Sequence, residues 1–175
     1  MRKSSGGPDA YRMLALRSLF FTIVIPGTVV VFIPYLILSR DGTGLIGPWT
    51  PLRLAGLALM VVGAAILLRC IWDFATMGQG TLAPIDPPTQ LVVRGLFRYV
   101  RNPMYLGVLM LLLGETAFFE SIALLQYTLA WFVAVHLVVV LYEEPSLRRR
   151  FGEPYQRYCR LVYRWLPTRP GGRVV

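Results

Sequence analysis

Four apolar runs constrain this chain more than any other feature, because each is close to the length of helix that crosses a bilayer. A helix needs about 20 apolar residues to span the hydrocarbon core, and within lipid only a helix or a closed barrel satisfies all of its backbone N–H and C=O groups. The runs cover residues 19–38, 52–74, 103–119 and 122–142. They predict an all-α integral membrane protein with about four transmembrane helices, the last two forming a helical hairpin.

The first two runs carry signals for how their helices bend and pack. Residues 19–38 are too long for the apolar part of a signal peptide and no small-residue cleavage site follows them, so we expect a retained helix that Pro26 and Pro34 kink. Residues 52–74 contain small side chains that let another helix approach closely. These are Gly56, Gly63, Ala64 and Ala65.

The basic residues give an expected orientation in the membrane. The formal net charge is +9 and 55% of the residues are hydrophobic. The charge lies beside the apolar runs, which favours a membrane protein over a nucleic-acid-binding one. With four spans, all 18 lysines and arginines except Arg40 and Arg53 fall on one side. The positive-inside rule makes that side cytoplasmic, so we expect a multi-pass protein of the inner cell membrane with both termini in the cytoplasm and no nucleic acid as partner.

A dense polar segment leads directly into the third run. Residues 94–107 read Arg-Gly-Leu-Phe-Arg-Tyr-Val-Arg-Asn-Pro-Met-Tyr-Leu-Gly. Asn102 is a favoured N-cap residue and Pro103 suits the first helical position. We therefore expect a membrane helix that begins at Pro103, and we expect the chemistry of the protein at this threshold.

A long connection precedes the threshold. Residues 75–93 are rich in glycine and proline, and long loops are often functional. Gly78-Gln79-Gly80 is not a dinucleotide fingerprint, because no strand precedes it and the third glycine is missing. We expect one membrane domain over residues 1–175, with two spans in 1–74 and the loop, hairpin and tail in 75–175.

Two adjacent carboxylates, Glu143 and Glu144, end the fourth run. Negative charge at a helix C-terminus opposes the helix dipole, and carboxylates at the edge of a membrane are candidates for function. Two interpretations stay open. The pair is either hydrated and bonded to Arg148 or Arg149, or it receives a cation or a polar cofactor against residues 98–105.

The tail after these glutamates predicts a cytosolic amphipathic helix. Its apolar side chains recur at helical spacing and arginines occupy the other faces, with a break at residues 152–154. The apolar residues are Phe151, Tyr155, Tyr158 and Val162.

The cysteines and the histidine predict neither a disulfide nor a metal site. Cys70 and Cys159 are far apart and show no pairing pattern. His136 is the only histidine and has no acidic or cysteine neighbour, so we interpret it as a hydrogen-bonded interior residue.

The threshold and the glutamate pair together resemble a known family. Residues 95–107 are followed, after the hairpin, by Glu143-Glu144-Pro145-Ser146-Leu147, Phe151-Gly152-Glu153-Pro154-Tyr155 and Arg164-Trp165-Leu166-Pro167. Over roughly residues 76–168 this resembles the isoprenylcysteine carboxyl methyltransferase and phospholipid methyltransferase superfamily of integral membrane enzymes.

The resemblance implies S-adenosylmethionine as the cofactor. Gln90, Leu91, Val92, Gly95 and Phe97 would line its adenosine side. Arg101, Asn102, Pro103 and Tyr105 would hold it, and Glu143 and Glu144 would bind its polar groups. The residues expected at the transfer centre are Arg98, Arg101, Asn102 and Glu143. Carboxylates suit the sulfonium and ammonium groups of such a cofactor, and arginine suits its carboxylate.

The acceptor is expected to be a small lipid-like molecule that enters from the bilayer. An isoprenylcysteine-type carboxyl or thiol is the first choice of acceptor group, and a phospholipid amine is the second. Asn102 replaces the histidine of the eukaryotic prenylcysteine enzymes, and the run before Glu143 lacks an arginine for a carboxyl substrate. The alternatives are a phospholipid N-methyltransferase, an NADPH-dependent sterol reductase-like enzyme and a non-enzymatic membrane scaffold.

Overall fold

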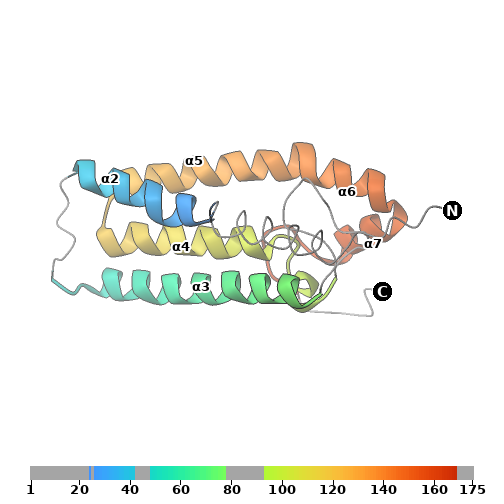
Figure 1. The fold of residues 1–175 in the computed structure, drawn as a ribbon, viewed down its shortest axis with the longest axis horizontal. Coiled ribbons are helices and arrows are strands. Elements are labelled where there is room, and N and C mark those ends of the chain that lie inside the picture. The colour runs from blue at the N-terminus through green and yellow to red at the C-terminus, as the bar shows by residue number, and fades with distance from the viewer. Residues whose placement is uncertain (1–23, 25, 42–47, 78–92, 169–175) are drawn as a thin grey trace, which may run out of the picture.

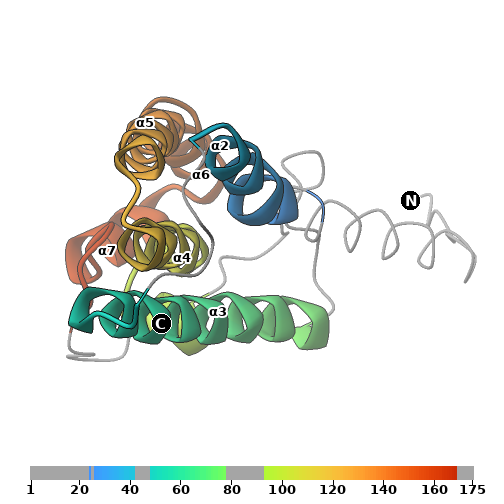
Figure 2. The ribbon, with the colours of Figure 1, turned by 90° about the vertical axis from the view of Figure 1, so that its left-hand side faces the viewer.

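The structure is a computed structural model that describes residues 24, 26–41, 48–77 and 93–168, and every regular element in these ranges is helical. Helix α4 lies between α3 and α5, and α2 packs beside α5 (Figures 1 and 2). The short helices α6 and α7 gather at one end of this bundle (Figure 1). The elements are η1 (Thr28–Phe32), α2 (Ile33–Asp41), α3 (Pro51–Met77), η2 (Gly95–Arg98), α4 (Pro103–Phe119), α5 (Ile122–Val138), η3 (Val139–Glu143), α6 (Glu144–Phe151) and α7 (Glu153–Leu161).

Two helical stretches are long and apolar enough to cross a membrane, Pro51–Asp73 and Ile122–Phe151. In each, only 17% of the most apolar window is buried within the protein. A core helix of a soluble protein hides its apolar face, whereas these two leave many large apolar side chains exposed. Thr28–Arg40 and Pro103–Phe119 are shorter apolar helices. The prediction of an all-helical chain holds for the described residues, and the number of spans stays a prediction.

Helices α3 and α4 meet along a glycine seam. A Cβ atom added to Gly63 would lie 2.7 Å from the carbonyl oxygen of Gly107, and one added to Gly114 would lie 2.7 Å from the carbonyl oxygen of Gly56. These contacts are with backbone atoms, which cannot turn aside as a side chain can. The predicted packing role of Gly56 and Gly63 is confirmed, whereas Ala65 lies on the exposed side of α3.

Each of the two π-helical segments in the described residues ends two residues before a proline. The N–H of Ile33 donates to the carbonyl of Thr28, and the N–H of Glu144 donates to the carbonyl of Val139, each five residues earlier. Pro34 and Pro145 follow directly. Because proline has no N–H and its ring crowds the carbonyl four residues back, a widened turn lets the helix continue through it.

The helix boundaries correct the sequence analysis in two places. Helix α3 continues to Met77, beyond the predicted end at residue 74. The fourth helix does not end at Glu143 and Glu144, because it continues through η3 and α6 to Phe151 and stops where Gly152 takes a positive φ of 57°. The two carboxylates therefore lie within a helix and not at its C-terminus. Helix α4, by contrast, spans Pro103–Phe119 as predicted.

Candidate functional site

The threshold before α4 and the C-terminal tail are joined by backbone hydrogen bonds at one end of the bundle (Figure 1). The N–H of Arg101 donates to the carbonyl of Tyr163 at 2.9 Å, and the N–H of Thr168 donates to the carbonyl of Tyr99 at 2.7 Å. The tail is therefore part of the site and fixes the position of the segment that leads into α4.

Asn102 occupies the predicted N-cap position of α4, but its side chain makes no capping hydrogen bond. Its amide instead donates to the carbonyl of Arg164 at 3.3 Å. The expected cap is thus replaced by a contact with the tail.

Glu144 is the centre of a buried ion-pair cluster. Its residue is only 5% exposed. One carboxylate oxygen accepts from Arg101 at 3.0 Å and from Arg164 at 2.6 Å, and the other accepts from Arg164 at 3.0 Å. Arg148 lies at 3.8 Å. The hydrogen bond to Glu144 raises the pKa of Arg164 above its usual value. Three segments that are distant in sequence converge on this one carboxylate.

Glu143 has a different environment from its neighbour. It is half-buried, and the hydroxyl of Tyr105 donates to its Oε1 at 2.6 Å. Within the described part of the chain no lysine or arginine pairs with it, and its carboxylate is held there by the hydrogen bond from the neutral phenol of Tyr105. The second oxygen remains for a ligand. The widened turn η3 carries both carboxylates toward the start of α4, and such π-type turns often lie at functional sites.

Arg101 connects the two halves of the site. Besides its bond to Glu144, it donates to the Sγ of Cys159 at 3.0 Å. Its Nε atom is buried and has no hydrogen-bond partner among the residues that the structure describes. A buried guanidinium N–H without an acceptor is costly, so this atom is suited to an anionic group of a bound molecule.

The tail buries its apolar face within the protein itself. Tyr155, Tyr158 and Val162 form a buried cluster onto which Val93, Leu147, Phe151 and Cys159 pack. The hydroxyl of Tyr158 donates to the carbonyl of Phe97 at 2.7 Å. Burial raises the pKa of the Tyr158 phenol, which keeps it protonated as the donor. The predicted interfacial role of this helix stays a prediction.

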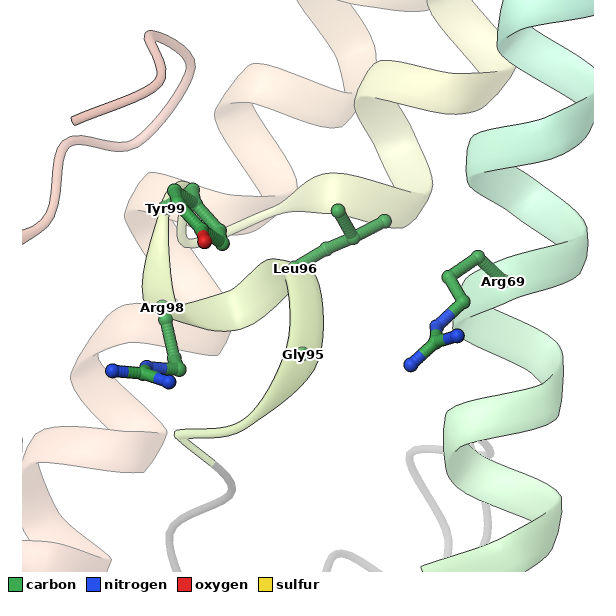
Figure 3. Close-up of a pocket in the computed structure, with 5 residues that line it drawn as sticks. All are labelled: Arg69, Gly95, Leu96, Arg98 and Tyr99. Carbon is green, nitrogen blue, oxygen red and sulfur yellow. The ribbon is translucent and has the colours of Figure 1, made fainter. Parts of the chain in front are cut away.

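A second feature lies at the end of α3, on the other side of η2. The carboxylate of Asp73 is buried against Gly95, whose φ is +56°, and pairs with Arg69 at 3.1 Å. A side chain at Gly95 would collide with this carboxylate. Beside it is a hollow of about 270 Å³, lined by Arg69, Gly95, Leu96, Arg98 and Tyr99 (Figure 3).

The structure brings together four of the predicted site residues, Arg101, Tyr105, Glu143 and Glu144. Gly95 and Phe97 lie in η2, and Pro103 is buried at the first turn of α4. Arg98 is exposed and lines the hollow beside Arg69, and among the described residues it makes no ion pair with Glu143 or Glu144. Gln90, Leu91 and Val92 lie outside the described residues.

Sequence reasoning missed two residues at this end of the bundle. Arg164 stood within a quoted motif, but only the fold shows that it pairs with Glu144. Asp73 was detectable as an isolated carboxylate near the end of an apolar run, which is unusual enough to single it out. The predicted hydrogen bond of His136 is confirmed, since its Nδ1 accepts from Trp165 at 3.1 Å, but the residue is half-buried and not in the interior.

The cluster fits a ligand that carries both signs of charge. Glu143 presents a carboxylate without a cationic partner, and Arg101 presents an N–H without an acceptor. S-adenosylmethionine carries a sulfonium, an ammonium and a carboxylate, which match these two groups. Among the described residues no group of three or more His, Cys, Asp or Glu side chains is arranged to hold a metal ion.

A comparison with family models matches residues 52–154 to the model described as phospholipid methyltransferase. The match covers α3, α4, α5, η3 and α6, so it begins a full helix earlier than the resemblance identified from the motifs. Comparisons with curated proteins and with solved structures found no match.

Proposed function

The chain belongs to the phospholipid methyltransferase family, and from this premise we propose that it transfers a methyl group from S-adenosylmethionine to a lipid-like acceptor at the membrane interface. The observation that carries the proposal is the contrast within the glutamate pair. Glu144 is neutralised by arginines, whereas Glu143 offers a carboxylate held only by Tyr105. A cationic methyl donor is the ligand that such a carboxylate would attract.

In this proposal the chain's own residues mainly bind and orient. When bound, S-adenosylmethionine supplies an electrophilic methyl group on a sulfonium. Glu143 would hold the cationic end, with Tyr105 fixing the carboxylate. Arg101 Nε would hold the carboxylate end. Asn102 and the Glu144 cluster position these groups by tying the tail to the start of α4. The adenosine side would lie against Phe97 and the segment containing Gln90, Leu91 and Val92.

The acceptor that the charges favour is a phospholipid amine. Arg101 and Arg164 are already engaged by Glu144, so the cluster offers no free guanidinium to a second carboxylate besides that of the cofactor. A prenylcysteine carboxyl, the other acceptor class, would also be repelled by Glu143. An amine must lose a proton before it attacks, and with Glu143 holding the cofactor this proton would pass to water.

The membrane arrangement is part of the proposal. Four spans would place the threshold, the glutamate pair and the tail on the cytoplasmic face of the inner membrane, as one domain with both termini inside. The exposed apolar faces of α3 and α5 support contact with lipid. The acceptor would then reach the site laterally from the bilayer, and the cofactor would reach it from the cytosol.

Binding is the first test. S-adenosylmethionine is titrated into the detergent-purified protein by calorimetry, with NADPH as the control ligand. We expect saturable binding of the first alone. Binding of NADPH alone would favour a reductase, and binding of neither by folded protein would favour a non-enzymatic scaffold.

Transfer is the second test. The protein is supplied with S-adenosylmethionine labelled in its methyl group, together with either phosphatidylethanolamine or a prenylcysteine thioether. Label in the first lipid is the expected outcome. Label only in the prenylcysteine would keep the methyltransferase and reject the amine acceptor.

A further inference from the structure

Two hollows adjoin each other at η2, apart from the glutamate cluster. The first is the polar one beside Arg69 and Arg98, of about 270 Å³ (Figure 3). The second, of about 340 Å³, has an entirely apolar lining that includes Ile66, Pro103 and Leu106. Leu96 and Tyr99 line both hollows, so the two share a wall.

The two hollows lie in the same order along the helices as the acyl chains and the head group of a lipid lie across a membrane. Ile66 lies one turn before Arg69 on α3, and Leu106 lies one turn inside α4 from Pro103. The apolar hollow is therefore deeper along both helices, and the polar hollow lies at their ends. A lipid in a bilayer has the same arrangement, because its acyl chains lie inside and its head group lies at the surface.

The charge at the polar hollow suits an anion. Arg69 pairs with Asp73 across 3.1 Å but remains 61% exposed. Arg98 is exposed and makes no ion pair with any described residue. Two arginines and one carboxylate leave a net positive charge. Arginine binds phosphate groups through paired N–H donors. By contrast, Arg149 on α6 is exposed but lines neither hollow.

We propose that these hollows bind an anionic phospholipid at a site separate from the glutamate cluster. Its phosphate would lie beside Arg69 and Arg98, and one of its acyl chains would lie along Ile66 and Leu106. The bound head would contact η2, which leads through Tyr99 and Val100 to Arg101. The bound lipid would thus stabilise the position of the segment that carries Arg101.

The experiment counts lipids bound to the full chain by native mass spectrometry. The protein is titrated with phosphatidylglycerol, phosphatidylcholine or inorganic phosphate. We expect phosphatidylglycerol to bind at least about tenfold more tightly than phosphatidylcholine. The variant Arg98→Gln should lower that affinity about tenfold, the value of one lost charge-assisted contact. Arg149→Gln is the matched control and should leave it unchanged.

Two further measurements separate the contribution of the lipid head group from that of its acyl chain. Leu106→Trp should block the apolar hollow and weaken the lipid, whereas inorganic phosphate alone should not displace it. Equal binding of the two lipids, an unchanged Arg98→Gln variant, or displacement by free phosphate would each overturn the proposal. S-adenosylmethionine affinity, measured on the same samples, reports independently on the proposed function. Arg98→Gln keeps the Arg69–Asp73 pair, so loss of fold does not explain its result.

Discussion

The two ends of the helical bundle are both closed by arginine–glutamate contacts, yet they differ in burial. At the hairpin end, Glu120 accepts hydrogen bonds from Thr50 at 2.8 Å and from Arg53 at 3.3 Å, and its side chain is 41% exposed. At the threshold end, the side chain of Glu144 is 6% exposed and pairs with arginines from two other segments. Similar side chains therefore make a solvated corner at one end and a buried junction at the other.

This difference indicates where the chain has given up stability for function. The hairpin end pairs its ions at a carboxylate that still reaches water. The threshold end buries a charged junction, which is a poor way to gain stability, and leaves Glu143 beside it without a cation. Charged groups that are buried without full compensation are typical of sites that receive a ligand.

The largest expected effect comes from breaking the buried junction. Glu144→Gln removes the buried charge opposite Arg101 and Arg164 and leaves these two half-buried guanidinium groups without their counterion. Removing one partner of a buried ion pair costs about 3–5 kcal/mol. Thermal unfolding in detergent should show this loss. The control Arg148→Gln affects only an exposed contact at 3.8 Å and should change the stability little. Equal losses of stability in both variants would show that burial does not make the ion pairs of Glu144 more important than the exposed contact of Arg148.

Substitution of the neighbouring glutamate should separate binding from stability. Glu143→Gln keeps the shape and the contact with Tyr105 but removes the charge. We expect S-adenosylmethionine to bind at least about tenfold more weakly, by about 1.4 kcal/mol, while the unfolding temperature stays close to that of the parent. Calorimetry on the same preparation measures the affinity. An unchanged affinity would remove Glu143 from the proposed site.

Local sequence signals were enough to place the starts of α4 and α5, but they could not pair the charges. Pro103 and Ser121 mark the starts of α4 and α5, because a proline at the first turn and a serine cap act within a few residues. The partners of Glu144 lie 43 and 20 residues away in sequence, and only the packed tail brings them together. The same tail takes the Asn102 side chain from its expected cap. The continuation past Pro145 required a π-type turn, which no local preference predicts.

A smaller effect is expected where the tail meets η2. Tyr158→Phe removes the hydrogen bond to the carbonyl of Phe97 and should cost about 1 kcal/mol. Burial raises the pKa of this phenol, so the folded protein holds its proton more tightly than the unfolded chain does. The stability from this group is therefore complete below the unfolded pKa of about 10 and is lost as the pH rises above it. Unfolding curves of parent and variant should converge at alkaline pH, whereas a constant difference would contradict this assignment.

The smallest effect is expected at the hairpin end, where Glu120→Gln tests the solvated corner directly. The carboxylate is partly exposed, so losing its contacts with Thr50 and Arg53 should cost no more than about 1 kcal/mol. Added salt should shrink the difference from the parent, because exposed charges are screened. S-adenosylmethionine affinity should not change, since Glu120 caps the C-terminal end of α4 and Tyr105 lies in its first turn. A loss as large as that of Glu144→Gln, or a loss of cofactor binding, would mean that the two ends are coupled through the glycine seam of α3 and α4 and do not act separately.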